Sequence, residues 1–151
     1  RSTPQSPREE KGSLPRSKKE NSRSGRVIFL FNHTQDFIHQ GDRKKGEVLL
    51  REVIAANPKL FPAHLALGDL LQKEGRLSEA VVSYRRVLSL RADHAVSRIS
   101  LGRIAEKRKM PDRALFHYEQ VVNIAADTFY PHFRMGVLRR DKGRLDLQSF
   151  I

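Results

Sequence analysis

Residues 61–94 read FPAHLALGDLLQKEGRLSEAVVSYRRVLSLRADH, and the spacing of their small and apolar residues recurs along the chain. Gly68, Gly102 and Gly136 are each 34 residues apart. Four other columns keep this interval: Leu67/Leu101/Met135, Ala80/Ala114, Tyr84/Tyr118 and Val53/Val87/Val121. A fixed period in this range predicts a stack of supersecondary units, each of which buries its apolar face against its neighbours.

Each unit contains two helical patterns separated by a turn. In residues 61–94, leucines at i, i+3 and i+4 form the apolar stripe of a first helix, and a second stripe begins after Gly75. Glycine readily takes the left-handed conformation that ends a helix, so Gly75 marks the turn. Gly41 and Gly143 stand in the same column, which predicts matching turns in the first and fourth units. The predicted fold is therefore all-α, built from antiparallel helix-turn-helix pairs.

These columns resemble the tetratricopeptide repeat family, in which a bulky residue, Leu-Gly, Gly, Ala, an aromatic residue and Ala recur over 34 positions. The second repeat matches with His64, Leu67-Gly68, Leu71, Gly75, Ala80, Tyr84, Val87 and Ala92. The third matches with Arg98, Leu101-Gly102, Ala105, Ala114, Tyr118, Val121 and Ala126. The resemblance implies repeats that start at 27, 61, 95 and 129, the last truncated, stacked as a right-handed superhelical solenoid. The first repeat is the weakest match, since His33-Thr34 replace Leu-Gly and Gly46 replaces Ala.

The chain divides into a basic N-terminal segment, residues 1–25, and a repeat domain, residues 26–151. The segment holds three prolines, six serines and few apolar residues, which predicts disorder because it buries too little surface to offset its ordering entropy. Residues 1–26 contain 8 Lys and Arg against 3 acidic residues, and the remainder contains 21 against 14. The net charge of +12 is thus spread over both parts and favours acidic partners without identifying one.

Several classes of function lack support in the sequence. The chain has no cysteine, so it forms neither disulfides nor thiolate metal sites. No apolar run approaches the roughly 20 residues that span a bilayer. The six histidines show no helical zinc spacing, and phosphate loops and nucleophile elbows are absent, which predicts no enzyme activity, metal or cofactor in this segment. Because the chain starts at Arg1, we expect a fragment or a processed product, with a slight preference for a cytoplasmic or nuclear location.

In the tetratricopeptide family the first helix of each repeat lines a concave groove, and this resemblance selects candidate binding residues by column. The predicted partner-binding residues are Ile28, Phe31, Leu65, Asp69, Lys73, Val96, Ile99, Arg103, Tyr130 and Phe133. The second and fifth columns are apolar in every repeat, which favours a docked partner. The alternative is that these residues pack between neighbouring first helices. Of the residues needed for the family's carboxylate clamp, only Arg134 is present, so a clamp is not expected.

The leading functional hypothesis is a protein–protein interaction module, a scaffold or adaptor that holds an unidentified peptide or helix in this groove. One alternative is that the chain is the repeat region of a larger enzyme, such as a transferase or hydroxylase. A second is a nucleic-acid-binding repeat that uses a basic edge, although no aromatic stacking series or per-repeat base code supports it. The basic turns of that edge, at 43–45, 73–76, 107–109 and 142–144, also suit an acidic protein.

Overall fold

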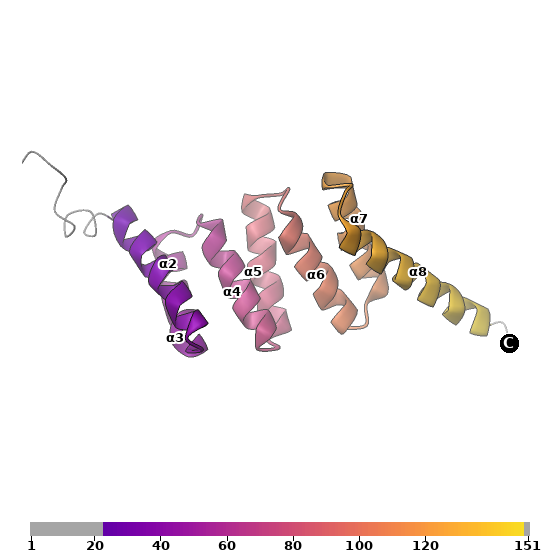
Figure 1. Ribbon diagram of the computed structural model, residues 1–151, viewed down its shortest axis with the longest axis horizontal. Coiled ribbons are helices and arrows are strands. Elements are labelled where there is room, and N and C mark those ends of the chain that lie inside the picture. Colours follow the sequence, from indigo (N-terminus) through magenta and orange to yellow (C-terminus); the bar gives the residue numbers. More distant parts are fainter. Residues whose placement is uncertain (1–22, 150–151) are drawn as a thin grey trace, which may run out of the picture.

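The computed structural model describes residues 23–149, which form seven helices and no strand (Figure 1). The helices are α2 (Arg23–His39), α3 (Arg43–Ala56), α4 (Phe61–Lys73), α5 (Leu77–Leu90), α6 (Ala95–Lys107), α7 (Pro111–Ile124) and α8 (Phe129–Gln148). Most contacts between helices join elements that are consecutive in the chain. The predicted all-α solenoid of helix pairs is confirmed. The segment predicted to be disordered lies outside the described residues, except for 23–25, which begin α2.

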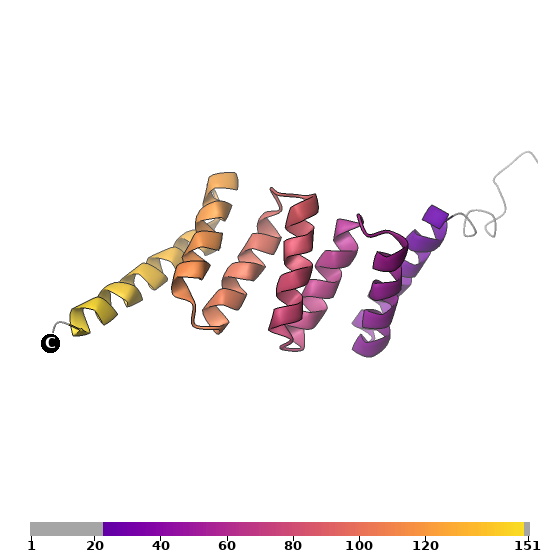
Figure 2. The same cartoon turned by 180° about the vertical axis from the view of Figure 1, so that it is seen from behind.

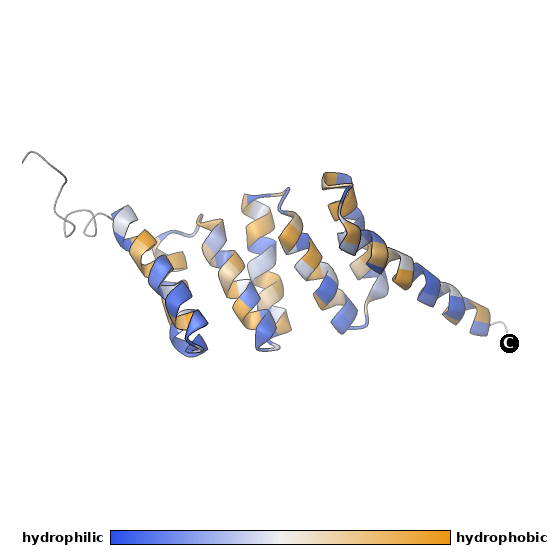
Figure 3. Cartoon of the chain, viewed as in Figure 1, coloured by the Kyte–Doolittle hydropathy of each residue, from blue (hydrophilic) through white to orange (hydrophobic). Residues whose placement is uncertain are grey.

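The helices form two layers. Figure 1 looks onto α2, α4, α6 and α8, the first helices of the repeats, and Figure 2 looks onto α3, α5 and α7, the second helices. We call these two sides the first-helix face and the second-helix face. The turns within the pairs lie along one edge, the lower one in Figure 1, and the connections between pairs lie along the opposite edge. Figure 3 shows hydrophilic residues at the lower ends of α2 and α4, beside these turns.

The turns within the pairs are made by a left-handed residue. Gly41 has φ +87° and Gly75 has φ +76°, as their column predicted. In the third repeat the same column holds Lys109, which takes φ +56° although it carries a side chain. Pro111 then begins α7, where its missing N–H needs no helical partner. The turn is therefore kept where the glycine is lost.

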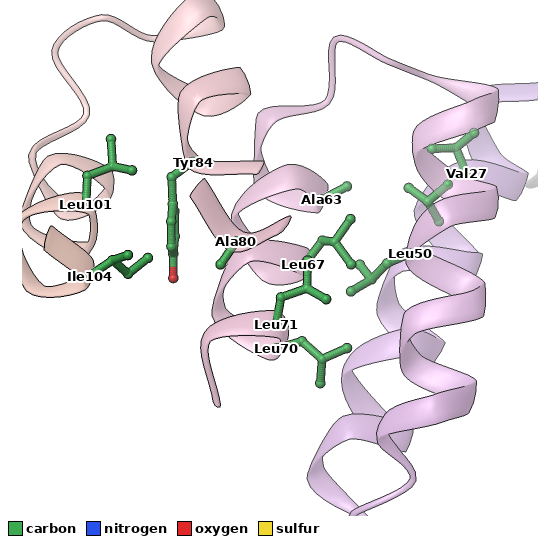
Figure 4. Close-up of a cluster of buried hydrophobic side chains, with 11 residues drawn as sticks. Val27, Leu50, Ala63, Leu67, Leu70, Leu71, Ala80, Tyr84, Leu101 and Ile104 are labelled. Carbon is green, nitrogen blue, oxygen red and sulfur yellow. The ribbon is translucent and has the colours of Figure 1, made fainter. Parts of the chain in front are cut away.

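The core depends on a tyrosine that lies against a glycine. A Cβ on Gly68 would lie 2.9 Å from Tyr84 Cε1, and one on Gly102 would lie 2.6 Å from Tyr118 Cε1. Both tyrosines are fully buried. Figure 4 shows Tyr84 between Ala80 of its own helix and the α6 residues Leu101 and Ile104 of the next repeat. The ring thus joins the two helices of one repeat and reaches the next one.

The first repeat departs from the pattern in a compensated way. Thr34 stands in the glycine column, and the tyrosine column holds the smaller Leu50, so that both side chains fit and both are fully buried. The Thr34 hydroxyl donates to the Leu30 carbonyl oxygen at 2.7 Å, which satisfies its buried polar group. Gly46 replaces alanine because a Cβ there would lie 2.6 Å from Cγ1 of Ile38.

The turn predicted at Gly143 is wrong. The helix α8 runs without a break from Phe129 to Gln148, and Gly143 has no positive φ. A helix reversal is stabilised by the packing of the returning helix, whereas residues 143–148 at the end of α8 are all exposed in the described part of the chain. A Cβ on Gly136 would accordingly meet nothing within 4 Å, in contrast to Gly68 and Gly102. Without that packing, a single glycine is tolerated inside the helix at a cost of about 1 kcal/mol.

Replacing Gly102 by leucine should destabilise the fold by about 1–3 kcal/mol, because the new side chain displaces the buried ring of Tyr118. Replacing Gly136 by alanine is the matched control, and it should leave stability unchanged or raise it by up to about 1 kcal/mol, since alanine favours the helix. Urea denaturation followed by circular dichroism measures both. Equal midpoints for the wild type and the Gly102→Leu variant would contradict the role of the ring.

Candidate functional site

The first-helix face is hollowed between α2 and α4. The hollow has a volume of about 420 Å³ and is lined by Phe31, Gln35, Ile38, His39, Arg43, Pro62, Leu65, Ala66, Asp69, Leu70 and Lys73. Four of the predicted binding residues, Phe31, Leu65, Asp69 and Lys73, therefore meet in one place. Phe31 and Leu65 are half-buried and pack against the core, whereas the two charged residues are exposed. The hollow combines an apolar wall with charged groups at its rim.

The carboxylate of Asp69 is held in place by the buried tyrosine of its repeat. The Tyr84 hydroxyl donates to Asp69 Oδ1 at 2.6 Å and lies 2.8 Å from Gln72 Oε1. Burial of the ring raises the pKa of the Tyr84 hydroxyl, and the neighbouring Asp69 carboxylate raises that pKa further. Tyr84 therefore stays a neutral donor, and it orients Asp69 on the first-helix face.

Aromatic rings dominate the part of this face on α6 and α8. Arg103 lies over the ring of Tyr130, with its guanidinium carbon 6.0 Å from the ring centroid. Phe129 and Phe133 stack with their centroids 5.8 Å apart and an interplanar angle of 14°. The exposed fraction is 52% for Phe133 and 39% for Tyr130. Exposed rings of this kind supply rigid contact area to a bound partner.

The apolar columns divide into two classes by exposure. Phe31, Leu65 and Ile99 are half-buried and pack against the core, which is the alternative interpretation given to them from the sequence. Ile28 and Val96 are more than half exposed, with 59% and 55% of their surface accessible. The exposed group, together with Tyr130 and Phe133, is the part of the predicted set that is free to contact a partner. The binding role of all ten residues stays a prediction.

One feature of this face was missed in the sequence. Arg134 of α8 donates to both carboxylate oxygens of Glu106 on α6, at 2.9 and 2.7 Å, and this bidentate pair raises the pKa of Arg134. Arg134 was the single residue compatible with a carboxylate clamp, and its guanidinium is already hydrogen-bonded to the Glu106 carboxylate. Opposite charges on facing first helices are the sequence signal that could have indicated the pair.

The basic edge is partly neutralised. Arg76 contacts Glu47, Glu74 and Glu79 at 2.6, 3.3 and 2.7 Å. Lys142 lies 2.9 Å from Asp112. Lys107 and Lys109 form no ion pair with any residue of the described part of the chain. Arg43, Lys44 and Lys73 also form no ion pair within residues 23–149, so uncompensated positive charge remains at the α2–α3, α4–α5 and α6–α7 turns.

The described residues also bear on metal binding and membrane insertion. Within 23–149, no group of three histidine, aspartate or glutamate side chains is placed to hold a metal ion. None of the helices in that range combines the length and the apolar character that a membrane crossing needs.

Comparisons with known proteins agree with this architecture. Residues 61–94 match the family model described as tetratricopeptide repeat, so the resemblance noted in the sequence is confirmed. Comparison with curated proteins gave no match.

Three solved structures illustrate the likeness in fold. The first tetratricopeptide repeat domain of Spaghetti (RPAP3), bound to the HSP90 peptide SRMEEVD, has a TM-score of 0.70 at 11% identity, and the match covers 78% of this chain and 93% of that chain. MamA has a TM-score of 0.73 at 17% identity, with 84% and 74% covered. The Yersinia enterocolitica type III secretion chaperone SycD, in complex with a peptide of the translocator YopD, has a TM-score of 0.72 at 10% identity, with 77% and 94% covered. At these identities the likeness establishes the fold alone.

The tyrosine column provides a matched pair of substitutions. Replacing Tyr84 by phenylalanine should lower the free energy of unfolding by about 0.5–1.5 kcal/mol, because its hydrogen bond to Asp69 is lost. Replacing Tyr118 by phenylalanine should cost less or nothing, because the buried Tyr118 hydroxyl lies near Glu106 and Tyr130 but makes no hydrogen bond of standard geometry within residues 23–149. Chemical denaturation of both variants tests this difference, and equal losses would refute it.

Proposed function

We propose that this chain, a tetratricopeptide-repeat protein, is a protein-interaction module that holds a peptide or a helix of a partner on its first-helix face. The observation that carries the proposal is the hollow between α2 and α4, in which an apolar wall meets exposed charges. Exposed apolar residues on α6 and α8, Val96, Tyr130 and Phe133, extend the apolar surface beyond this hollow. Such a surface favours an extended or helical segment with apolar anchors spaced along it.

The charged residues of the face would orient the bound segment. Lys73 has no ion-pair partner within residues 23–149, whereas Asp69 is fixed by Tyr84. A flexible cation and a fixed anion at one rim favour a segment that carries charges of both signs. Apolar anchors usually dominate binding energy, and rim charges mainly affect association rate and register.

Two similar structures support the proposal by what they contain. The Spaghetti domain is bound to an HSP90 peptide, and SycD is in complex with a translocator peptide. The carboxylate clamp is not proposed for this chain, because Glu106 pairs with its one compatible residue, Arg134. We therefore infer an apolar, internal segment as the ligand rather than an acidic C-terminal tail.

A rival surface exists on the other side of the molecule. A hollow of about 490 Å³ lies between α3 and α5 and is lined in part by Val82, which is 66% exposed. It is more apolar at its surface than the first-helix hollow, but a salt-bridged glutamate and arginine, Glu79 and Arg51, stand in its wall. Any binding experiment must therefore include a substitution on each face.

Replacing Phe133 or Val96 by aspartate should lower the affinity for peptides that bind the first-helix face by about tenfold or more, because each change puts a charge into a desolvated apolar contact. Peptides selected on the wild-type chain from a displayed library serve as ligands, and isothermal titration measures their affinity. Val48→Asp on α3 is the matched control, since Val48 is 58% exposed and lies outside the proposed surface. If Val82→Asp abolished peptide binding while Phe133→Asp and Val96→Asp retained it, the binding site would lie on the second-helix face instead.

Neutralising Lys107, Arg108 and Lys109 together should leave the affinity for these peptides nearly unchanged at physiological salt, because the turn lies at the edge of the proposed surface. The nucleic-acid alternative forecasts the opposite result. In that case the same variant loses binding to single-stranded RNA, and wild-type affinity falls steeply as salt rises. Fluorescence anisotropy with an RNA oligonucleotide and with a selected peptide, at two salt concentrations, separates the two hypotheses.

A further inference from the structure

The contact between α3 and α5 is bridged by a network of four charged side chains. Arg76 Nη1 lies 2.6 Å from Glu47 Oε2, and Arg76 Nη2 lies 2.7 Å from Glu79 Oε2. Arg51 Nη2 lies 2.9 Å from Glu47 Oε1 and 3.4 Å from Glu79 Oε2. The hydrogen bond from Arg76 is the main cause that lowers the pKa of Glu47. Two carboxylates therefore compensate two arginines on this part of the second-helix face.

One repeat later the same columns have lost every carboxylate. Adding 34 to each position replaces Glu47, Glu74 and Glu79 by Val81, Arg108 and Arg113, and replaces Arg51 and Arg76 by Arg85 and Met110. Three carboxylates and two arginines thus become three arginines and no carboxylate. Arg85 keeps the column of Arg51, whereas Arg108 and Arg113 stand where the earlier repeat has the glutamates Glu74 and Glu79.

These residues surround a narrow crevice between α5 and α7. It has a volume of about 30 Å³ and is lined by Val81, Arg85, Leu101, Ile104, Ala105, Arg108, Met110, Arg113 and His117. Arg85 and Arg113 form no ion pair within residues 23–149, and the one side-chain bond of Arg108 goes to Ser78 Oγ at 2.6 Å. The volume admits about one water-sized group, so a ligand would lie over the mouth of the crevice.

The environment of His117 reports the same excess of positive charge. Its Nδ1 atom is buried and has no hydrogen-bond partner within the described residues. Burial lowers the pKa of the His117 imidazole, and Arg98 of α6, Arg85 of α5 and Arg113 of α7 lower it further. Among the charged groups of residues 23–149 that shift this pKa, none is a carboxylate. Because these positive charges are not compensated, the crevice attracts an anion from outside the chain.

We propose that this crevice is a second binding site, which takes an acidic protein segment through Arg85, Arg108 and Arg113. Carboxylates of the partner would compensate these arginines from outside the chain, as Glu47 and Glu79 compensate Arg51 and Arg76 from within it in the preceding repeat. The template in the chain itself is a pair of carboxylates, which favours an acidic peptide over a nucleic acid or a free phosphate. Guanidinium groups bind carboxylates by charge-assisted, often bidentate hydrogen bonds. The site lies on the second-helix face and does not depend on the groove proposed above.

The test uses the whole chain and a hexaglutamate peptide as the probe, with hexaglutamine and inorganic phosphate as separate arms. Nuclear magnetic resonance follows the pKa of His117, which should rise when hexaglutamate binds, because added carboxylates favour the imidazolium form. His64 and His132 lie outside the crevice, so their ring resonances should not move when hexaglutamate is added at fixed pH. A rise caused by phosphate alone, or the absence of any rise with hexaglutamate, would overturn the assignment.

Arg113→Glu restores an acidic residue in the column of Glu79 and should weaken hexaglutamate binding by about tenfold or more, because charge-assisted contacts are lost and Arg85 gains a partner in the chain. Arg144→Glu is the matched control, since it makes the same change in net charge at an exposed residue outside the crevice, and its effect should stay below about twofold. Melting curves verify that both variants fold. Equal losses in the two variants would show attraction by net charge alone and would overturn the site.

Discussion

A tyrosine ring on a second helix lies against the bare Cα of a glycine on the first helix, and the packing of the central repeats depends on this contact. The missing Cβ gives the ring its place, and the ring then fills the space that would otherwise separate one repeat from the next. Tyr84 shows both roles, because it touches Gly68 within its repeat and belongs to the same core cluster as Leu101 and Ile104 of the next. In the first repeat, Thr34 and Leu50 divide the same volume differently. The two columns therefore vary together, as close-packed interiors require.

The fold could be predicted from the sequence because it depends on residues of fixed size at a fixed interval. The glycine and alanine columns require small side chains and the tyrosine column requires a large one. The same requirement recurs in the second and third repeats. The end of α8 could not be predicted in this way. Glycine at position 143 suits a turn, but a turn also needs a returning helix that packs on α8. Local sequence does not show whether such a helix packs there.

The candidate site was less accessible to sequence reasoning. The column pattern placed Phe31, Leu65, Asp69 and Lys73 together, and they do line one hollow. It did not reveal how deeply each apolar side chain is buried, since this depends on the distance between adjacent first helices. It also missed the pairing of Glu106 with Arg134, which joins residues 28 positions apart on two helices. The surfaces differ between repeats because columns at the rim vary freely in charge, whereas a packing column changes in size only when its neighbour compensates, as Thr34 and Leu50 show.

The contacts between consecutive helices have a consequence for how the chain folds. Residues that meet across a pair are close in sequence, so the entropy lost in closing each loop is small, and rapid folding is expected for such a topology. Any pair can serve as a nucleus, and neighbouring helices then add to it one at a time. Within residues 23–149, the central pair, α4 and α5, has a repeat on either side, whereas α2 and α8 each have packed neighbours on one side. On heating, unfolding should therefore spread inward from α2 and α8, and Tyr84 of α5 should be among the last side chains to become exposed to solvent.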